Sequence, residues 1–142
     1  MRFVPSVRMW PALERSPDPS HVHHPAALRR VLDADGGFTV RLRSGQPVSG
    51  GICVATDRAS ALSFARAEWC DRRVDEWIAS VSTRPTWRAR CIGGWIDRST
   101  DTVWLDVVHV VPRPCRRLAM TMARWSKQHC VFDLTRNETV PV

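Results

Sequence analysis

The chain has 142 residues, of which 44% are hydrophobic and 25% are charged, and its formal net charge is +7. This length and balance are typical of a single globular domain and exclude a largely disordered chain. No apolar run approaches the roughly 20 residues of a membrane-spanning helix, and proline and arginine interrupt the N-terminus, so we expect neither a membrane contact nor a signal peptide.

Arginine supplies almost all of the positive charge, since Lys127 is the only lysine and tyrosine is absent. A basic chain favours acidic partners, nucleic acid first. Arginine in place of lysine is also how a GC-rich genome encodes basic proteins, and the basic residues are dispersed instead of forming blocks. Charge alone is therefore a weak argument for nucleic-acid binding.

Residues 1–35 read as an irregular segment that ends in a short helix. A short edge strand is predicted over 1–7, followed by a proline-rich loop. A proline at the first helical position begins the helix, which covers 25–32 and ends at a glycine pair. Alternating apolar and polar residues then predict strands over 38–42 and 52–55.

A long helix is predicted over 58–82, with Asp57 as its N-cap. Its apolar residues recur at helical spacing on two slightly rotated faces. These residues are Leu62, Ala65 and Trp69 on one face, and Val74, Trp77, Ile78 and Val81 on the other.

A β-hairpin is the best-defined element of the second half. Its strands are predicted over 87–97 and 102–111, joined by a turn at 98–101. The Gly93-Gly94 pair indicates a bulge or the close approach of another backbone. Apolar residues on both faces of the second strand predict a central position in the sheet. These residues are Val103, Leu105 and Val107 on one face, and Trp104, Val108 and Val110 on the other.

A basic helix over 113–128 follows the hairpin, and a last strand is predicted over 129–134. Leu118, Met122 and Trp125 recur at three- and four-residue spacing. We therefore expect these three side chains to face the core.

The pattern predicts an α+β fold: a mainly antiparallel sheet of about four or five strands with two long helices on one face. The irregular segment covers 1–35, a single α+β domain covers 36–134, and a polar tail covers 135–142.

Four short motifs lie along the second and third quarters of the chain and at its last predicted strand: Gly-Gly-Phe-Thr-Val at 36–40, Ser-Gly-Gly-Ile-Cys-Val-Ala at 49–55, Ile-Gly-Gly-Trp-x-Asp…Leu-Asp-Val at 92–107 and Phe-Asp-Leu at 132–134. In this order the motifs resemble those of small uncharacterised proteins of actinobacterial phages and prophages. The resemblance covers about 36–134, and this chain lacks the Thr-Gly-Gly-like ending that such proteins tend to have. It implies a shared fold and a mobile-element origin, and it carries over no activity and no catalytic residue.

No cofactor or metal motif stands out. His21, His23 and His24 lie in a proline-bounded loop without further ligands at suitable spacing, so we interpret them as an incidental exposed cluster. Neither a Gly-x-Ser-x-Gly elbow nor a phosphate-binding Gly-Lys-Ser/Thr loop is present. We expect no cofactor.

Three titratable residues on the hairpin have structural interpretations that outweigh catalytic ones. Asp97 is expected to bond turn amides, and Asp106 to be a partly buried carboxylate that pairs with an arginine or accepts backbone N–H bonds. His109 is expected to be a satisfied core histidine.

Five cysteines are spaced too widely for a Cys-x-x-Cys pair. Their odd number and apolar neighbours predict reduced, mostly buried thiols of a cytoplasmic protein. They are Cys53, Cys70, Cys91, Cys115 and Cys130.

These observations argue against an enzyme and favour an interaction protein that binds a host or viral macromolecule in the host cytoplasm. An unknown protein partner is favoured. A nucleic-acid-binding accessory or regulatory protein that uses the basic helix, with weak binding, is the alternative, and a small enzyme or toxin is the third hypothesis. The expected interaction surface consists of Trp95, Arg113, Arg116, Arg117, Arg124 and Lys127.

Overall fold

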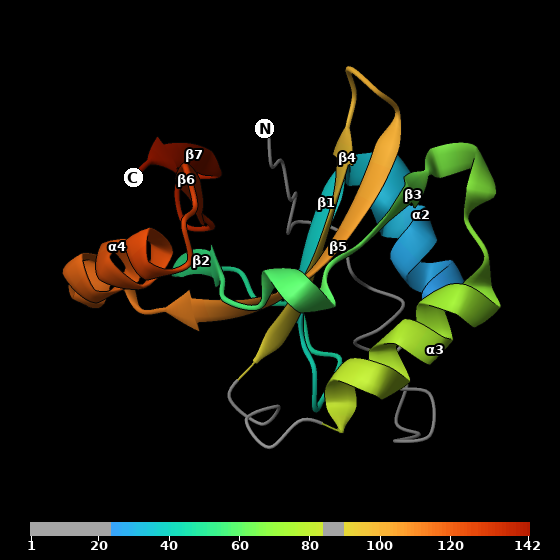
Figure 1. Ribbon diagram of the computed structural model, residues 1–142, viewed down its shortest axis with the longest axis horizontal. Coiled ribbons are helices and arrows are strands. Elements are labelled where there is room, and N and C mark those ends of the chain that lie inside the picture. Colours follow the sequence, from blue (N-terminus) through green and yellow to red (C-terminus); the bar gives the residue numbers. More distant parts are fainter. Residues whose placement is uncertain (1–23, 84–89) are drawn as a thin grey trace.

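The computed structural model describes residues 24–83 and 90–142, which form an α+β architecture around one antiparallel sheet (Figure 1). The strands are β1 (Gly37–Arg41), β2 (Ile52–Ala55), β3 (Leu62–Ala65), β4 (Cys91–Asp97), β5 (Thr102–Val111), β6 (Cys130–Asp133) and β7 (Glu138–Pro141). The α-helices are α2 (Pro25–Asp35), α3 (Asp71–Ser82) and α4 (Arg116–Trp125), and short 3₁₀ turns cover Arg58–Ser60, Arg66–Glu68 and Arg113–Cys115.

Strand β5 is the centre of the sheet, as its two apolar faces predicted. The strand order is β1-β4-β5-β2-β6-β7. Along one edge of β5, β4 pairs continuously from Asp97↔Thr102 to Cys91↔Val108. Along the other edge, β3 lies beside the first half of β5 and β2 beside the second half. Within residues 24–83 and 90–142 the sheet therefore has seven strands, more than the four or five expected.

The helices pack on the face of β5 that carries Val103, Leu105 and Val107, which are at most 1% exposed. We call this the helix-covered face. At one end α2 and α3 cover it, and at the other end Ala119 and Ala123 of α4 pack near β2 and β6 (Figure 1). The opposite face carries Trp104, Asp106 and Val108, because side chains alternate along a strand. In the described ranges, no helix contributes to the hydrophobic cluster on this opposite face.

The helix predicted over 58–82 is wrong in its first half. Only Asp71–Ser82 is α-helical, whereas Leu62–Ala65 is strand β3. Leu62 and Phe64 point to the core with Ser63 between them, a two-residue alternation that also fits their spacing. The backbone of β3 forms hydrogen bonds with one edge of β5. This tertiary pairing favours a strand over a helix at 62–65.

Helix α4 is shorter than the helix expected over 113–128, and a different side of it faces the sheet. It runs from Arg116 to Trp125 after a 3₁₀ turn, and its buried residues are Ala119 and Ala123. Leu118 is 55% exposed and Trp125 is 83% exposed, so the prediction that they face the core is wrong. Adjacent helical residues lie about 100° apart, and the small alanines allow the helix to approach β2 closely.

Gly94 is structural, although neither a bulge nor a neighbouring backbone explains it. The β4–β5 register is regular through this residue. A Cβ atom at Gly94 would lie 2.3 Å from the ring of Phe38, which is 1% exposed. The glycine therefore provides the space that an aromatic side chain of β1 occupies.

The strand expected over 1–7 lies outside the described residues. The expected polar tail contains β7, which pairs with β6 from Asp133↔Glu138 to Cys130↔Pro141. Helix α2 belongs to the main domain, because Leu28 and Leu32 are part of its largest core cluster.

Candidate functional site

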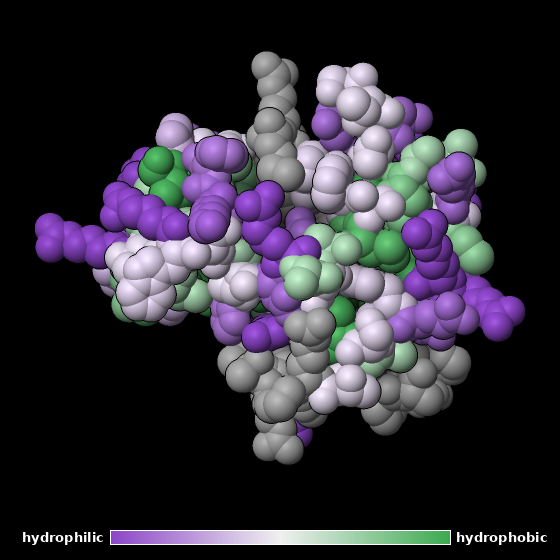
Figure 2. Space-filling model, in the orientation of Figure 1, coloured by the Kyte–Doolittle hydropathy of each residue, from purple (hydrophilic) through white to green (hydrophobic). Residues whose placement is uncertain are grey.

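The outer side of α4 is the most exposed apolar feature in the described part of the chain. Trp125 and Leu118 are the only large hydrophobic residues exposed there. They are seven positions apart, which places them two helical turns apart on one side of the helix. Hydrophilic side chains project from the end of the molecule where Figure 1 places α4 (Figure 2). We call the exposed residues of α4 and of the turn after it the α4 surface, and they are Arg116, Arg117, Leu118, Arg124, Trp125 and Lys127.

The charges of the α4 surface all have the same sign. Its four basic residues are exposed, and within 24–83 and 90–142 none of them forms an ion pair. The helix itself contains no acidic residue. The surface therefore offers two apolar side chains beside uncompensated positive charge.

Arg113 does not belong to this surface. Its Nε lies 3.3 Å from Oδ2 of Asp133, a carboxylate that is only 4% exposed. The backbone N–H groups of Thr135 and Arg136 donate to the other oxygen of Asp133. Arg113 thus has a structural role: it neutralises a buried carboxylate at the β6–β7 turn.

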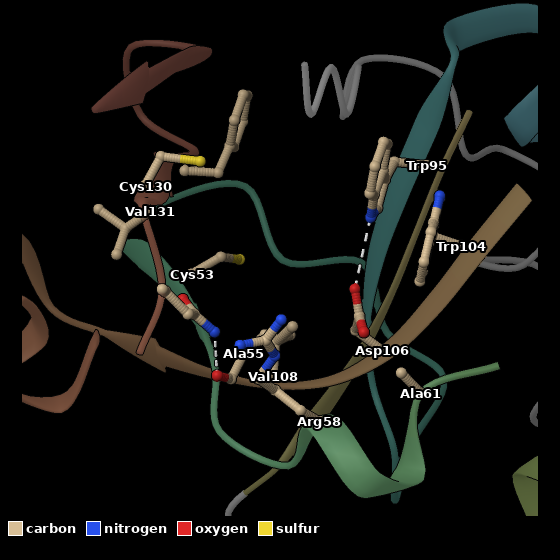
Figure 3. Close-up of a pocket in the computed structure, with 12 residues that line it drawn as sticks. Cys53, Ala55, Arg58, Ala61, Trp95, Trp104, Asp106, Val108, Cys130 and Val131 are labelled. Atoms are coloured by element: carbon tan, nitrogen blue, oxygen red, sulfur yellow. Dashed lines mark hydrogen bonds between the residues drawn. The ribbon is translucent and has the colours of Figure 1, made fainter. Parts of the chain in front are cut away.

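Trp95 also lies elsewhere, so its expected place on an exposed surface is wrong. Only 2% of it is exposed, and its indole stacks on Trp104 with ring centroids 5.8 Å apart and 7° between the planes. The two residues face each other across the β4–β5 register. They stand at one end of a cavity on the opposite face of the sheet, and Cys130 and Val131 stand at the other end (Figure 3).

The cavity measures about 260 Å³ and contains a carboxylate and a guanidinium group. Nε1 of Trp95 donates to Oδ2 of Asp106 across 3.4 Å. Burial raises the pKa of Asp106, while the Trp95 bond and the charge of Arg58 act in the opposite direction. Arg58 comes from a 3₁₀ turn, and its Nη1 donates to the backbone oxygen of Lys127 across 3.4 Å.

Gln128 completes the polar wall of the cavity. Its Nε2 donates to the backbone oxygen of Ala55, at the end of β2 (Figure 3). The rest of the lining is mainly apolar, with Val108 and Phe132 among its residues. A concave, mostly apolar space with a few converging polar groups is the usual form of a small-ligand site.

All five thiols are free, as the sequence predicts. Cys53 and Cys91 are buried on the opposite face, whereas Cys70 and Cys115 are exposed, so the expectation of mostly buried thiols holds only in part. Burial raises the pKa of the Cys53 thiol to about 12, and burial raises the pKa of Cys91 as well. Neither buried thiol has the thiolate character of a nucleophile.

The other titratable residues of the hairpin have structural environments. Asp97 accepts hydrogen bonds from the backbone N–H and the hydroxyl of Ser99, which lower its pKa, so its predicted turn role is confirmed. His109 is half-buried, and desolvation, with a smaller effect of Arg90, lowers its pKa. Asp106 is partly buried as expected, but its hydrogen-bond donor is the Trp95 indole instead of an arginine or a backbone N–H.

The histidine cluster lies mostly outside the described residues: His24 is described and exposed, and His21 and His23 are not described. Over 24–83 and 90–142, no three His, Cys, Asp or Glu side chains gather in a way that would hold a metal ion. In the same ranges, no helix combines the length and the apolar character that crossing a bilayer requires.

The chain matches no protein-family model, no curated protein and no solved structure.

Some residues of the cavity could be predicted from the sequence, and others could not. A turn at 98–101 already implies that Trp95 faces Trp104, because hairpin register follows from loop length. Arg58 and Gln128 carry no motif that predicts a site. They reach the cavity because β2 and β6 pair, with Ile52 opposite Asp133 and Cys53 opposite Phe132, although these residues are far apart in the sequence.

Proposed function

We propose that this protein is a non-enzymatic interaction protein of phage or prophage origin, which binds an acidic protein surface of its host or virus through the α4 surface. The mobile-element origin rests on the sequence motifs at 92–107 and 132–134. The binding role rests on one observation: Trp125 is 83% exposed on a helix whose charged residues are all basic.

An exposed tryptophan is an unusual use of a large apolar side chain. Burying such a side chain inside the fold would stabilise the domain by a few kcal/mol. Tryptophan and arginine are the residue types most enriched at the energetic centres of protein interfaces, where an aromatic ring fills a pocket and charges surround it. The α4 surface has this composition, with Trp125 and Leu118 as anchors and Arg117 and Arg124 beside them.

The charge of the surface defines the partner's chemistry. Four unpaired cations, on a chain of net charge +7, attract an acidic surface and accelerate its association. The pair of apolar anchors favours a protein partner, because an apolar protein pocket can bury both Trp125 and Leu118.

The experiment compares the wild type with a Leu118→Ala/Trp125→Ala double variant as baits in host lysate, with and without nuclease. We expect a protein that is captured by the wild type, retained after nuclease treatment and lost with the double variant. The control bait is Arg72→Ala/Arg98→Ala, which removes two exposed arginines outside α4. Equal capture of that protein by the wild type and the double variant would contradict the proposal.

Nucleic-acid binding is the second candidate, and the same four cations favour it. Phosphate contacts release counterions, so binding would weaken steeply with salt, while an exposed indole can stack on an unpaired base. We expect duplex DNA binding to be weak and independent of sequence. Binding titrations between 50 and 200 mM salt distinguish the candidates, because Arg116→Ala/Arg117→Ala would reduce the salt slope by roughly two for nucleic acid.

A further inference from the structure

The cavity on the sheet face opposite the helices is small, and its size limits the ligands that it can hold. Its volume of about 260 Å³ lies just below the usual range for ligand pockets, roughly 300–1,000 Å³. It therefore suits a small ring compound and not a peptide or a strand of nucleic acid. It lies on the sheet face that carries Trp104 and Asp106, and neither Leu118 nor Trp125 lines it, although Arg58 of its wall donates to the backbone oxygen of Lys127.

The walls of the cavity favour a flat ligand. The indole rings of Trp95 and Trp104 stack nearly parallel to each other, and this pair of rings forms the aromatic end wall of the cavity (Figure 3). Trp95 is held in place by the hydrogen bond from its Nε1 to Asp106. An aromatic ring that stacks on such a wall gains offset π-contacts in addition to its burial.

The polar groups favour a ligand with adjacent hydrogen-bond donors. One oxygen of Asp106 receives the Trp95 bond, and neither carboxylate oxygen is among the buried, unpartnered atoms of the described chain. The residue paired with Asp106 on β4 is Gly93, which places no side chain beside the carboxylate. A carboxylate accepts two parallel N–H bonds, and Arg58 offers donors within the same cavity.

We propose that this cavity binds a small planar heteroaromatic ring of the guanine type. Two adjacent N–H donors of the ligand bond to the Asp106 carboxylate, its ring packs on the Trp95–Trp104 wall, and its exocyclic oxygen accepts a hydrogen bond from Arg58. The ring fills the space between the indoles and the apolar side chains of Val108 and Phe132.

The test is calorimetric titration of the full chain with guanosine, and with adenosine as the comparison nucleoside. Adenosine stacks equally well but lacks the two adjacent donors. We expect saturable guanosine binding that is at least tenfold tighter than adenosine binding, together with a shift of the Trp95 indole N–H resonance. Asp106→Asn should weaken guanosine binding by about ten- to a hundredfold, the effect of losing hydrogen bonds to a charged group.

Asp75→Asn is the matched control, since Asp75 is an exposed carboxylate on α3, on the helix-covered side of the sheet. It should bind guanosine like the wild type. Asn is nearly isosteric with Asp, and the thermal unfolding of Asp106→Asn shows whether the variant is folded. The proposal is overturned if neither nucleoside binds saturably, if the two bind equally, or if a folded Asp106→Asn protein retains wild-type affinity. None of these outcomes depends on Trp125 or Leu118, so the proposal stands or falls separately from the α4 surface.

Discussion

Helices α3 and α4 pack on the same face of one sheet but expose different parts of themselves. Helix α3 buries a stripe of bulky residues, Val74, Trp77, Ile78 and Val81. Helix α4 buries only Ala119 and Ala123, and its own tryptophan points to solvent. The bulky side chains of α3 thus stabilise the domain, whereas Leu118 and Trp125 of α4 remain exposed, and only Met120 and Met122 of this helix pack partly buried against the core.

The largest expected effect is the difference in stability between a variant that lacks Trp77 of α3 and one that lacks Trp125 of α4. Trp77 is 9% exposed, and its Nε1 donates to the backbone oxygen of Ser60 across 2.6 Å. Trp77→Ala should lower the free energy of unfolding by about 3–5 kcal/mol, whereas Trp125→Ala should change it by less than about 0.5 kcal/mol. Urea denaturation of both variants measures this difference. A similar loss in the two variants would show that α4 is not oriented as described.

The core beneath α2 and α3 can also be disrupted by adding volume. Gly94→Val would place methyl groups where the ring of Phe38 lies, so we expect a loss of roughly 1–3 kcal/mol. Thermal and urea unfolding check the prediction. Gly50→Ala is the control, because the added Cβ would meet only an ordinary contact 3.5 Å away. An unchanged melting temperature for Gly94→Val would contradict the packing described.

A matching experiment at the α4 end of the sheet replaces a buried alanine of this helix with a larger residue. Ala123 is completely buried against β2 and β6, so Ala123→Leu should cost about 1–3 kcal/mol by forcing the helix away from the sheet. Leu118→Ala, on the exposed side, should be nearly neutral. Denaturation curves for this pair measure how tightly the α4 interface is packed, and a neutral Ala123→Leu would reveal unfilled space there.

The smallest expected effect is the pH-dependent contribution of the Asp106 carboxylate to stability. Burial raises the pKa of Asp106 above its value in the unfolded chain, so the folded state binds this proton more readily. Stability from this group is therefore present at low pH and is lost as pH rises through the folded-state pKa. Asp106→Asn should raise the melting temperature at pH 7, with a smaller gain at pH 3.

Thermal scans of Asp106→Asn and the wild type at both pH values test this sign. Asp75→Asn, at an exposed position, should show no such pH-dependent gain. A melting temperature that falls at pH 7 in the Asp106→Asn protein would mean that the Trp95 and Arg58 interactions outweigh desolvation.

The spacing of apolar residues predicted an element correctly where that spacing fitted only a helix or only a strand. The hairpin of β4 and β5 follows from its turn and its β-branched strands, and Leu105 is buried as expected. The segment 62–82 fitted two periodicities in its first part, and the pairing of β3 with β5 resolved them. The burial of Trp95 follows from strand geometry, but the arrival of Arg58 and Gln128 beside it does not.

By itself the amino-acid sequence determined the α+β class, the central place of 102–111, the short helix after residue 24 and the free state of the thiols. These features depend on spacing, turn residues and composition, which act over a few neighbouring residues. Only the tertiary structure decided which stripe of α4 faces the sheet and which side chains surround Asp106. Those outcomes depend on contacts between residues far apart in the chain, where a buried alanine and an exposed tryptophan can exchange the places that hydrophobicity alone would assign them.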